Sequence, residues 1–501
     1  MFNLMGAAML SQPDVIIALV AGTLGGMFIG AMPGLSASMA VALLIPVTFG
    51  MSGEAGITLL TAVYTSAIYG GSITACLLHT PGTPASAATA ADGFALTKQG
   101  KGLKAIGVST VASMIGGTIS AIALLFIAPA LSQVALKFSS LEYFLIGVFG
   151  LTIIGSLAGD NMMKGLLSGC LGLMIGCIGL DIQSSAPRYC FGILELQSGI
   201  QLVPAMIGLF SLSQVMFSIE DVAKGKHTVL DENAKNLTGS PVPTWKEFKP
   251  LIPTIAQSSI IGVLVGILPG AGGDIGSWIS YNTAKNSSKH PEEFGTGIPD
   301  GIWAPEVANN ASVGGAVIPM IALGIPGDGT TAMLLGGLTI HGIQPGPLMQ
   351  QNNPVFTYMI FLSALLAAIL CLLVEIFGIR WFPKLLDAPY HFLYPAILAL
   401  CLLGVYIETF NIANIIMACF FIAVGLYMMY AGIPTTPFIL SFVLGSQMEN
   451  YFRKAISYGK GDWTLFFTRP VSCILLIVAV GSVFVPLIKE HLAKKKAAAA
   501  Q

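Results

Sequence analysis

Long apolar runs recur from one end of this chain to the other, and they constrain its fold more than any other feature. A helix needs about 20 residues to cross about 30 Å of hydrocarbon, and its backbone must satisfy its own hydrogen bonds there. Candidate crossings are 14–32, 57–79, 105–130, 141–158, 165–180, 199–217, 251–268, 311–325, 355–379, 393–407, 412–430 and 470–488. Composition agrees, because 54% of the residues are apolar, only 9% are charged, and the mean hydropathy is +0.81. The sequence therefore predicts an all-α polytopic membrane protein with about a dozen crossings.

Shorter apolar segments lie between these runs, at 36–49, 84–96, 272–284, 329–341 and 434–446. Proline-glycine pairs precede four of them: Pro33-Gly34, Pro81-Gly82, Pro269-Gly270 and Pro326-Gly327. Proline lacks a backbone donor and glycine tolerates positive φ, so a helix ends or unwinds there and the next begins with free N–H groups. We expect broken helices or re-entrant hairpins. The alternative is four ordinary kinks, since both residues are common in membrane helices.

The chain also repeats itself weakly. Residues 68–93 resemble residues 312–337, with paired glycines, an apolar stretch, Pro-Gly and then small or hydroxyl residues. Each half carries two breaks. We therefore expect a first membrane half at 1–217, a polar connecting loop at 218–250, a second half at 251–488 and a cytoplasmic tail at 489–501.

Basic residues indicate how the halves face the membrane, because short cytoplasmic loops collect Lys and Arg. Lys98, Lys101 and Lys104 follow the second break, whereas 342–354, after the fourth, has no basic residue. Between the breaks the bias reverses, because 50–57 has none and 282–300 has Lys285 and Lys289. This pattern predicts two inverted repeats, an arrangement typical of secondary transporters of the elevator or rocking type.

Converging helix N-termini favour an anion such as a carboxylate, because they carry partial positive charge and unpaired N–H groups. No Lys or Arg occurs in 1–97 or 290–379, so backbone, hydroxyl and amide groups would have to hold it. The candidate substrate residues are Pro33, Gly34, Ser36, Ser38, Pro81, Gly82, Thr83, Ser86, Pro269, Gly270, Gly272, Gly273, Ser277, Asn309, Asn310, Pro326, Gly327, Gly329, Thr330 and Thr331. Asp274 and Asp328 stand beside breaks, either as ligands of a coupling Na⁺ or proton or as helix caps.

The other polar residues in the apolar segments are expected to have structural roles. Glu306 and Asp92 are expected nearer the membrane edge, and His79 and His341 as hydrogen-bonded side chains. The cysteines show no metal-ligand spacing, which predicts buried thiols and no metal or other cofactor. The balanced charge of 218–250 argues against nucleic acid, and no nucleotide-binding loop or hydrolase motif occurs, so the chain is not expected to be an enzyme.

Four segments carry a family resemblance: GAMPGLSASMAVALLIPVTFG, YGGSITACLLHTPGTPASAATAADG, GILPGAGGDIGSWISY and GIWAPEVANNASVGGAVIPMIALGIPGDGTTAMLLGGLTIHGIQPGP. They resemble the large membrane subunit of the tripartite tricarboxylate transporters. The resemblance implies a bacterial inner-membrane permease for a tricarboxylate or related carboxylate, driven by an ion gradient. It also implies two partners, a small four-helix membrane subunit and a periplasmic substrate-binding protein. A stand-alone carboxylate permease and a membrane-embedded enzyme are the alternatives.

Overall fold

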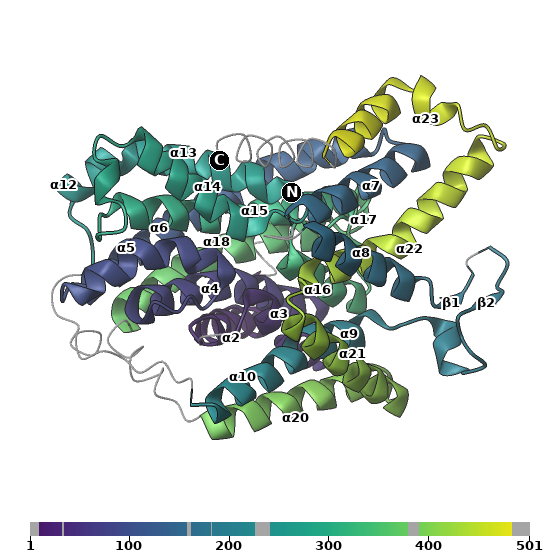
Figure 1. Ribbon diagram of the computed structural model, residues 1–501, viewed down its shortest axis with the longest axis horizontal. Helices are drawn as coiled ribbons and strands as arrows, with labels where there is room; N and C mark the ends of the chain where they lie inside the picture. The colour runs from purple at the N-terminus through teal and green to yellow at the C-terminus, as the bar shows by residue number, and fades with distance from the viewer. Residues whose placement is uncertain are drawn as a thin grey trace, which may run out of the picture.

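The computed structural model describes residues 10–32, 35–157, 162–181, 183–225, 241–378 and 390–482, and these are mostly helical (Figure 1). The helices of the first half are α2 (Pro13–Gly30), α3 (Ala37–Leu44), α4 (Gly53–Leu78), α5 (Ala87–Lys98), α6 (Gly102–Ala135), α7 (Ser140–Leu157), α8 (Met162–Gly176), α9 (Leu202–Met206) and α10 (Ser213–Ala223). Those of the second are α12 (Trp245–Phe248), α13 (Ile252–Ile267), α14 (Gly272–Ser287), α15 (Asp300–Leu323), α16 (Gly329–Ile340), α17 (Met349–Asn352), α18 (Pro354–Gly378), α20 (Tyr390–Thr409), α21 (Ile412–Tyr430), α22 (Thr435–Tyr458) and α23 (Leu465–Thr468). Strands β1 (Gly179–Leu180) and β2 (Pro187–Arg188) pair as an antiparallel hairpin.

Seven helical stretches among the described residues are long and apolar enough to cross a membrane. They are Pro13–Gly30, Gly53–Leu78, Gly102–Ala135, Leu202–Ala223, Trp245–Ile267, Pro354–Gly378 and Ile412–Tyr430. Shorter apolar helices add to these, including α8, α16 and the segment Pro470–Ser482. The all-α polytopic membrane fold predicted from the sequence is thus confirmed.

Several predicted boundaries are wrong. The run expected at 311–325 is the second half of α15, which begins at Asp300. The prediction missed the first half of this helix because buried polar residues lower its hydropathy. The segment expected as a half-span at 434–446 is part of α22, which continues to Tyr458. Helix α10 continues to Ala223, past the predicted start of the connecting loop at 218. The predicted tail at 489–501 lies outside the described residues.

Helices α4 and α15 are buried at the centre of the molecule, where α4 packs on α2 and α15 packs on α13 and α6. Glycines allow their backbones to approach closely, as is common between membrane helices. A Cβ atom on Gly26 of α2 would lie 2.6 Å from the carbonyl oxygen of Val63 on α4. One on Gly262 of α13 would lie 2.3 Å from the carbonyl oxygen of Ala308 on α15. The two halves therefore use the same packing device at corresponding pairs.

Two hydrogen bonds join the ends of the two halves. At one end of the molecule, the Gln99 side chain after α5 donates to the Thr296 carbonyl before α15, at 2.8 Å. At the start of α4, Thr48 is hydrogen-bonded to His341 at the end of α16, with 3.0 Å between Oγ1 and Nε2. The start of α15 thus lies beside the end of α5, and the start of α4 lies beside the end of α16. How the halves face the membrane stays a prediction.

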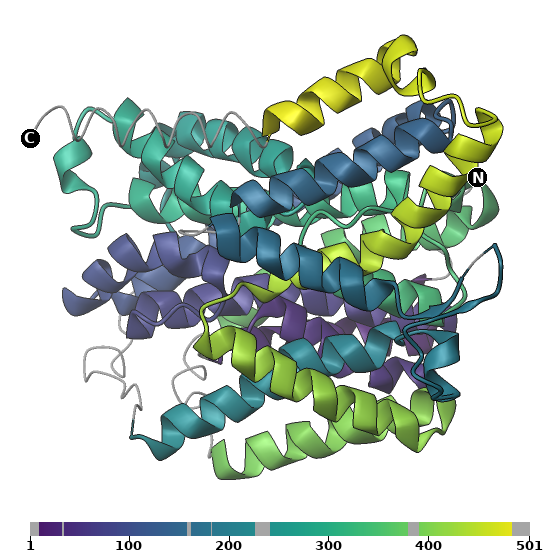
Figure 2. The ribbon, with the colours of Figure 1, turned by 45° about the vertical axis from the view of Figure 1, so that its right-hand side comes forward.

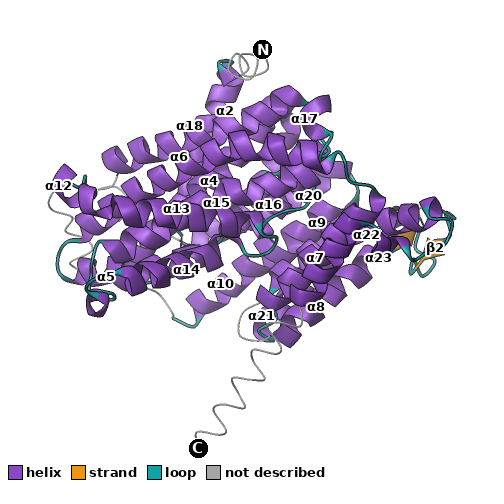
Figure 3. Cartoon of the chain, turned by 90° about the horizontal axis from the view of Figure 1, so that it is seen from above, coloured by secondary structure: helices purple, strands orange, loops and turns teal. Residues whose placement is uncertain are grey.

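Two further groups of helices lie beside this centre. Helix α22 packs on α7 and α8, and α21 packs on α10 and on the π-helical segment η4 (Ile207–Leu212). Figures 1 and 2 show these groups on different sides of the central helices. Viewed from above, α12 and the β2 strand lie at opposite ends of the molecule (Figure 3).

The hairpin after α8 is held by Asp181. Its Oδ1 accepts hydrogen bonds from the backbone N–H groups of Gln183 at 3.0 Å and Ser184 at 2.8 Å. Arg453 of α22 contacts Oδ2 at 2.7 Å. The hydrogen bonds from Ser184, first from its backbone and then from its hydroxyl, hold the pKa of Asp181 well below its usual range.

The cysteines and histidines match the sequence predictions only in part. All eight cysteines are free thiols, but Cys170 and Cys419 are exposed rather than buried. They lie on α8 and α21, where a lipid-facing surface accepts an apolar thiol. His341 is hydrogen-bonded as expected, and His79 stacks on Phe94 with 4.9 Å between ring centroids.

Candidate functional site

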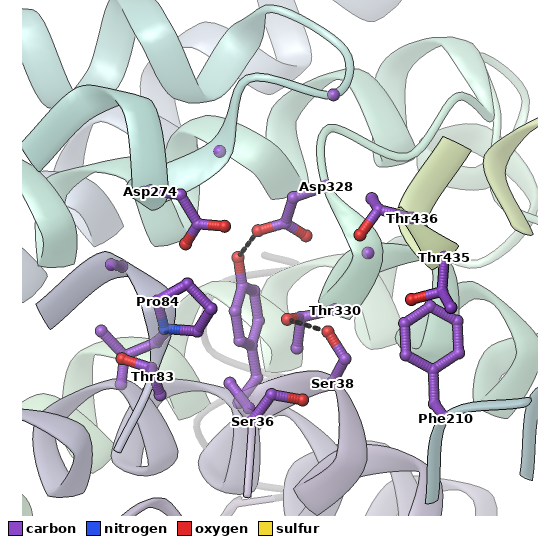
Figure 4. Close-up of a pocket in the computed structure, with 18 of the residues that line it drawn as sticks. Ser36, Ser38, Thr83, Pro84, Phe210, Asp274, Asp328, Thr330, Thr435 and Thr436 are labelled. Atoms are coloured by element: carbon purple, nitrogen blue, oxygen red, sulfur yellow. Dashed lines mark hydrogen bonds between the residues drawn. The ribbon is translucent and has the colours of Figure 1, made fainter. Parts of the chain in front are cut away.

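A cavity of about 240 Å³ lies where the broken helices of both halves meet (Figure 4). The hydroxyl-bearing and acidic side chains Ser36, Ser38, Thr83, Asp274, Asp328 and Thr330 point into the same space. Its remaining polar lining comes from α4, α15, α22 and the segment around η4. The cavity is thus built from both halves of the chain.

Five helical segments begin at this cavity. Four of them follow the Pro-Gly breaks: α3, the short helix η2 (Pro84–Ser86) that leads into α5, α14 and α16. The fifth is α22, whose first residues Thr435 and Thr436 line the cavity. The positive ends of helix dipoles therefore gather around one space, and side chains already cap one N–H group each of α3 and α16.

Backbone hydrogen bonds fix the non-helical conformation of the chain at the breaks. The N–H of Gly82 donates to the carbonyl of Gly71 at 3.1 Å, and the N–H of Gly327 donates to the carbonyl of Ala316 at 3.3 Å. The two bonds have the same spacing along the chain, as a repeat requires. Gly270, at φ 82°, donates to the Gly327 carbonyl at 2.7 Å and so joins the third break to the fourth. Its left-handed backbone favours glycine.

One side of the cavity is fully hydrogen-bonded. Ser38 of α3 and Thr330 of α16 share a hydrogen bond of 2.9 Å between their hydroxyl oxygens. Tyr64 of α4 donates to Asp328 Oδ2 at 2.8 Å. Asp328 Oδ1 accepts from the backbone N–H of Thr331 at 2.7 Å, which is an N-cap of α16. Asp328 is therefore a helix cap in this structure, with one oxygen also bound by a second helix.

Two of the three corresponding side chains on the other side are unpaired among the described residues, and the third, Thr83, donates only to Ser86 Oγ at 3.4 Å. When the two halves are aligned in sequence at their Pro-Gly pairs, Asp274 corresponds to Ser38, Thr83 to Asp328 and Asn309 to Tyr64. Among the described residues, the Asp274 carboxylate makes no hydrogen bond or ion pair with another side chain, although it is accessible from the cavity. Asn309 is fully buried behind Gly273, and neither of its side-chain polar atoms has a partner. Buried amides are normally satisfied, so this side has unused polar groups.

The charges of the cavity are unusual. Among the residues that the structure describes, no Lys or Arg lines it, and Asp274 and Asp328 are its two acids. Positive potential comes only from helix N-termini, which suit a carboxylate, while the two acids suit a cation. The described residues contain no group of three or more His, Cys, Asp and Glu that could hold a metal ion.

The structure brings ten of the predicted site residues to the cavity: Ser36, Ser38, Thr83, Gly270, Gly272, Gly273, Asp274, Asp328, Gly329 and Thr330. Ten others lie in the surrounding framework: Pro81, Gly82, Ser86, Pro269, Ser277, Asn309, Asn310, Pro326, Gly327 and Thr331. Ser86, for example, donates to the Gly71 carbonyl at 3.0 Å, and Ser277 donates to the carbonyl of Gly273 at 2.6 Å. Pro33 and Gly34 lie outside the described residues.

Sequence reasoning missed part of the lining. The missed residues with side chains on the cavity include Tyr64, Ile68, Phe210, Ser213, Gln214, Ser312, Met429, Thr435 and Thr436. Most lie in segments without a Pro-Gly pair. Of these residues, only Tyr64 could have been predicted, because it aligns in the repeat with Asn309, a candidate site residue.

Glu306 lies fully buried near the start of α15. Its expected depth near the membrane edge stays a prediction. Asp92 is also buried, and it accepts hydrogen bonds from the backbone N–H groups of Gly295, Gly297 and Ile298. The structural reading of Asp92 agrees with these contacts.

Comparison with known proteins gives a consistent family. The model described as "Tripartite tricarboxylate transporter TctA family" matches residues 16–440. An Agrobacterium vitis protein described as "Uncharacterized 52.8 kDa protein in TAR-I ttuC' 3'region" is 32% identical over 486 residues, which are 96% of this chain and 95% of that protein. A second, "Uncharacterized protein in TAR-II ttuC' 3'region", is 33% identical over 234 residues, 47% of this chain and 97% of its own length. No solved structure matches the chain.

Proposed function

Because the chain belongs to the tripartite tricarboxylate transporter TctA family, we propose that it is the large membrane subunit of a system that imports a carboxylate across the bacterial inner membrane. Uptake is driven by an ion gradient. A periplasmic binding protein delivers the substrate, and a small four-helix membrane subunit completes the assembly. Membership of the family supports a transport function and a membrane location. The carboxylate substrate, the ion coupling, the inner membrane and the two partner proteins are part of the proposal.

The convergence of five helix N-termini on one enclosed cavity carries this proposal. Each N-terminus offers N–H donors and a partial positive charge of about half an elementary charge. A carboxylate can accept several such hydrogen bonds without a Lys or Arg partner. The substrate class is therefore a tricarboxylate or a related carboxylate.

Asp274 and Asp328 bind the coupling cation in this scheme. A substrate with two or three negative charges is costly to hold at low dielectric without nearby positive charge. Na⁺ or a proton bound by these acids lowers that cost. The Asp274 carboxylate is the better placed of the two, because the oxygens of Asp328 already accept hydrogen bonds from Tyr64 and Thr331.

The direct test is uptake into proteoliposomes. The chain would be reconstituted with the small membrane subunit and supplied with labelled citrate, succinate or benzoate, with and without the binding protein, under imposed Na⁺ or proton gradients. We expect gradient-driven accumulation of at least one carboxylate that requires the binding protein.

Two results would contradict parts of the proposal. Equal uptake without the binding protein would favour a stand-alone permease. Recovery of a chemically altered substrate, identified by mass spectrometry, would instead indicate an enzyme.

A further inference from the structure

A second polar cluster lies inside the protein, apart from the cavity, around Glu306 of α15. Its side chain is fully buried. Oε1 accepts hydrogen bonds from Ser72 Oγ of α4 at 2.7 Å and from Thr89 Oγ1 of α5 at 2.5 Å. Oε2 accepts from Ser113 Oγ of α6 at 2.8 Å and from Asn310 Nδ2 of α15 at 3.5 Å. One carboxyl group thus joins four helices.

No positive charge accompanies Glu306. It takes part in no ion pair in the described part of the chain, and the sequence has no Lys or Arg between 290 and 379. Burying an ionised carboxylate without a counter-ion is expensive, and such a group reduces the cost by taking up a proton. Its surroundings therefore decide whether it can alternate between the two states.

The three hydroxyl partners of Glu306 suit both states. A serine or threonine hydroxyl can donate to a carboxylate or accept from a carboxylic acid, because it has one donor and two lone pairs. Protonation would require only that one hydroxyl turns round. Asp92 provides a contrast in the same protein, since three of its donors are backbone N–H groups, which can only donate. Those backbone donors cannot reverse, whereas the hydroxyls around Glu306 can, so the Glu306 site tolerates proton gain and loss.

The Glu306 cluster is coupled to the cavity through the elements that build both. Helix α15 contributes Ser312 to the cavity wall and Glu306 to the cluster, about 9 Å apart along the axis at about 1.5 Å per residue. Helix α4 contributes Ile68 to the cavity and Ser72 to the cluster, one turn apart. The segment after the second break contributes Ala85 and then Thr89 in the same way.

Two buried amides lie between the cavity and Glu306 on α15. Asn310 Nδ2 donates to the Glu306 carbonyl at 3.0 Å and to Glu306 Oε2 at 3.5 Å, but its Oδ1 has no partner within the described ranges. Neither polar atom of the Asn309 side chain has one. These amides supply unused donors and acceptors between the two sites.

The titratable groups on the surrounding elements do not provide a competing counter-ion. Tyr69 and Cys76 of α4 and Cys371 and Glu375 of α18 lie near Glu306, and none of them is basic. Tyr64 and Asp274 face the cavity, while Asp92 of α5 and Tyr281 of α14 bind each other. Helix α13 has no titratable residue, and α6 has only Lys104, in its first turn, where it pairs with Glu247.

We propose that Glu306 is a proton-binding site of the transport cycle, with Ser72, Thr89 and Ser113 as its hydroxyl partners. In one half of the cycle the carboxylate takes up a proton and becomes a carboxylic acid; in the other it releases that proton on the opposite side. This inference rests on the proposed function, since it assumes gradient-driven transport, and it adds a site separate from Asp274 and Asp328.

The first test uses Glu306→Gln, which keeps the shape and removes the exchangeable proton. In proteoliposomes, we expect this variant to lose accumulation of labelled citrate driven by a pH gradient. It should keep exchange of external labelled citrate for citrate loaded inside. Glu375→Gln, which removes another buried acid, is the matched control and should keep both activities. Undiminished pH-driven accumulation by Glu306→Gln would overturn the proposal.

A second measurement does not depend on transport. Infrared difference spectra of the purified chain between acid and alkaline pH should show a protonated carboxyl band that Glu306→Gln lacks and Glu375→Gln retains. The same band in Glu306→Gln would overturn the proposal. Failure of the parent to carry citrate, with the band assigned to Glu306, would count against the proposed function and not against the titrating site.

A third variant covers the case in which Glu306→Gln does not fold. Thr89→Val keeps the side-chain shape but removes one hydroxyl, and it should shift the pH profile of citrate exchange. Thr74→Val is its control, because the Thr74 hydroxyl donates only within its own helix, to Gly71. An unchanged pH profile in Thr89→Val would contradict the role of the hydroxyl partners.

Discussion

The hydroxyl of Tyr64 donates a hydrogen bond of 2.8 Å to Asp328 Oδ2, so a helix of the first half holds the start of α16 in the second. Tyr64→Phe removes this bond alone. A hydrogen bond to a charged group contributes about 1.5–3 kcal/mol, so we expect the KM for the transported carboxylate to rise about tenfold or more. Uptake kinetics would measure it. Tyr69→Phe is the control, since its hydroxyl bonds the Ala368 carbonyl instead; an equal effect there would show that the loss is not specific to the cavity.

Asp274→Asn and Asp328→Asn separate a cation ligand from a helix cap. Asparagine caps a helix about as well as aspartate but carries no charge. We expect both variants to lose dependence on the Na⁺ or proton gradient while largely keeping substrate binding, with the greater loss at Asp274. Uptake under each gradient, together with substrate exchange, gives the comparison. If both keep the gradient dependence of the parent, the two acids are caps and the cation binds elsewhere.

Gly327→Ala should abolish uptake while the protein still inserts in the membrane. A Cβ atom there would lie 2.5 Å from the Cα of Ala316, and backbone atoms cannot move aside cheaply. The fourth break would therefore be displaced from the cavity. Gly50→Ala is the matched control, because no atom lies within 4 Å of its added Cβ. Normal uptake by Gly327→Ala at normal expression would reduce this break to an ordinary kink.

Single-cysteine labelling tests the inverted repeat. We expect 98–104 and 282–300 to face the cytoplasm and 50–57 and 342–354 to face the periplasm, because basic residues collect in cytoplasmic loops. Contacts between Gln99 and Thr296, and between Thr48 and His341, place the members of each pair together. Cysteines at Gly53 and Lys285, in a background lacking Cys170 and Cys419, should react from opposite sides. Reaction from the same side would refute the inversion.

Asp181→Asn should loosen the hairpin after α8. Because the folded-state pKa of Asp181 is lowered, its contribution is present above the ordinary aspartate pKa of about 3.9 and is lost as pH falls through the lowered value. Limited proteolysis should therefore find the parent hairpin protected at neutral pH and the variant cut faster. Asp462→Asn, in another loop, is the control, and equal protection of parent and Asp181→Asn would contradict this role.

The breaks were predictable because their causes are local. Proline and glycine interrupt a helix wherever they stand together, and the residues that follow become its first turn, as Ser36 and Asp328 do. The all-α membrane class followed from the apolar runs for the same reason. Ten of the 20 predicted site residues that the structure describes accordingly reach the cavity.

The missed parts depend on contacts between distant segments. Phe210 and Thr436 line the cavity because η4 and α22 pack against it, and nothing in their own segments marks them. The early start of α15 was hidden because Glu306 and Asn309 are polar yet buried by neighbouring helices, which hydropathy cannot register.

The glycine contacts between α2 and α4, and between α13 and α15, also limit how this protein can move. At each contact a glycine of one helix lies against a backbone carbonyl of the other, so neither helix can slide or roll without a collision. Each pair should behave as a single rigid body. Large displacements are then left to the joints at the Pro-Gly breaks, where the backbone already departs from helical geometry, and these are the same places that form the cavity.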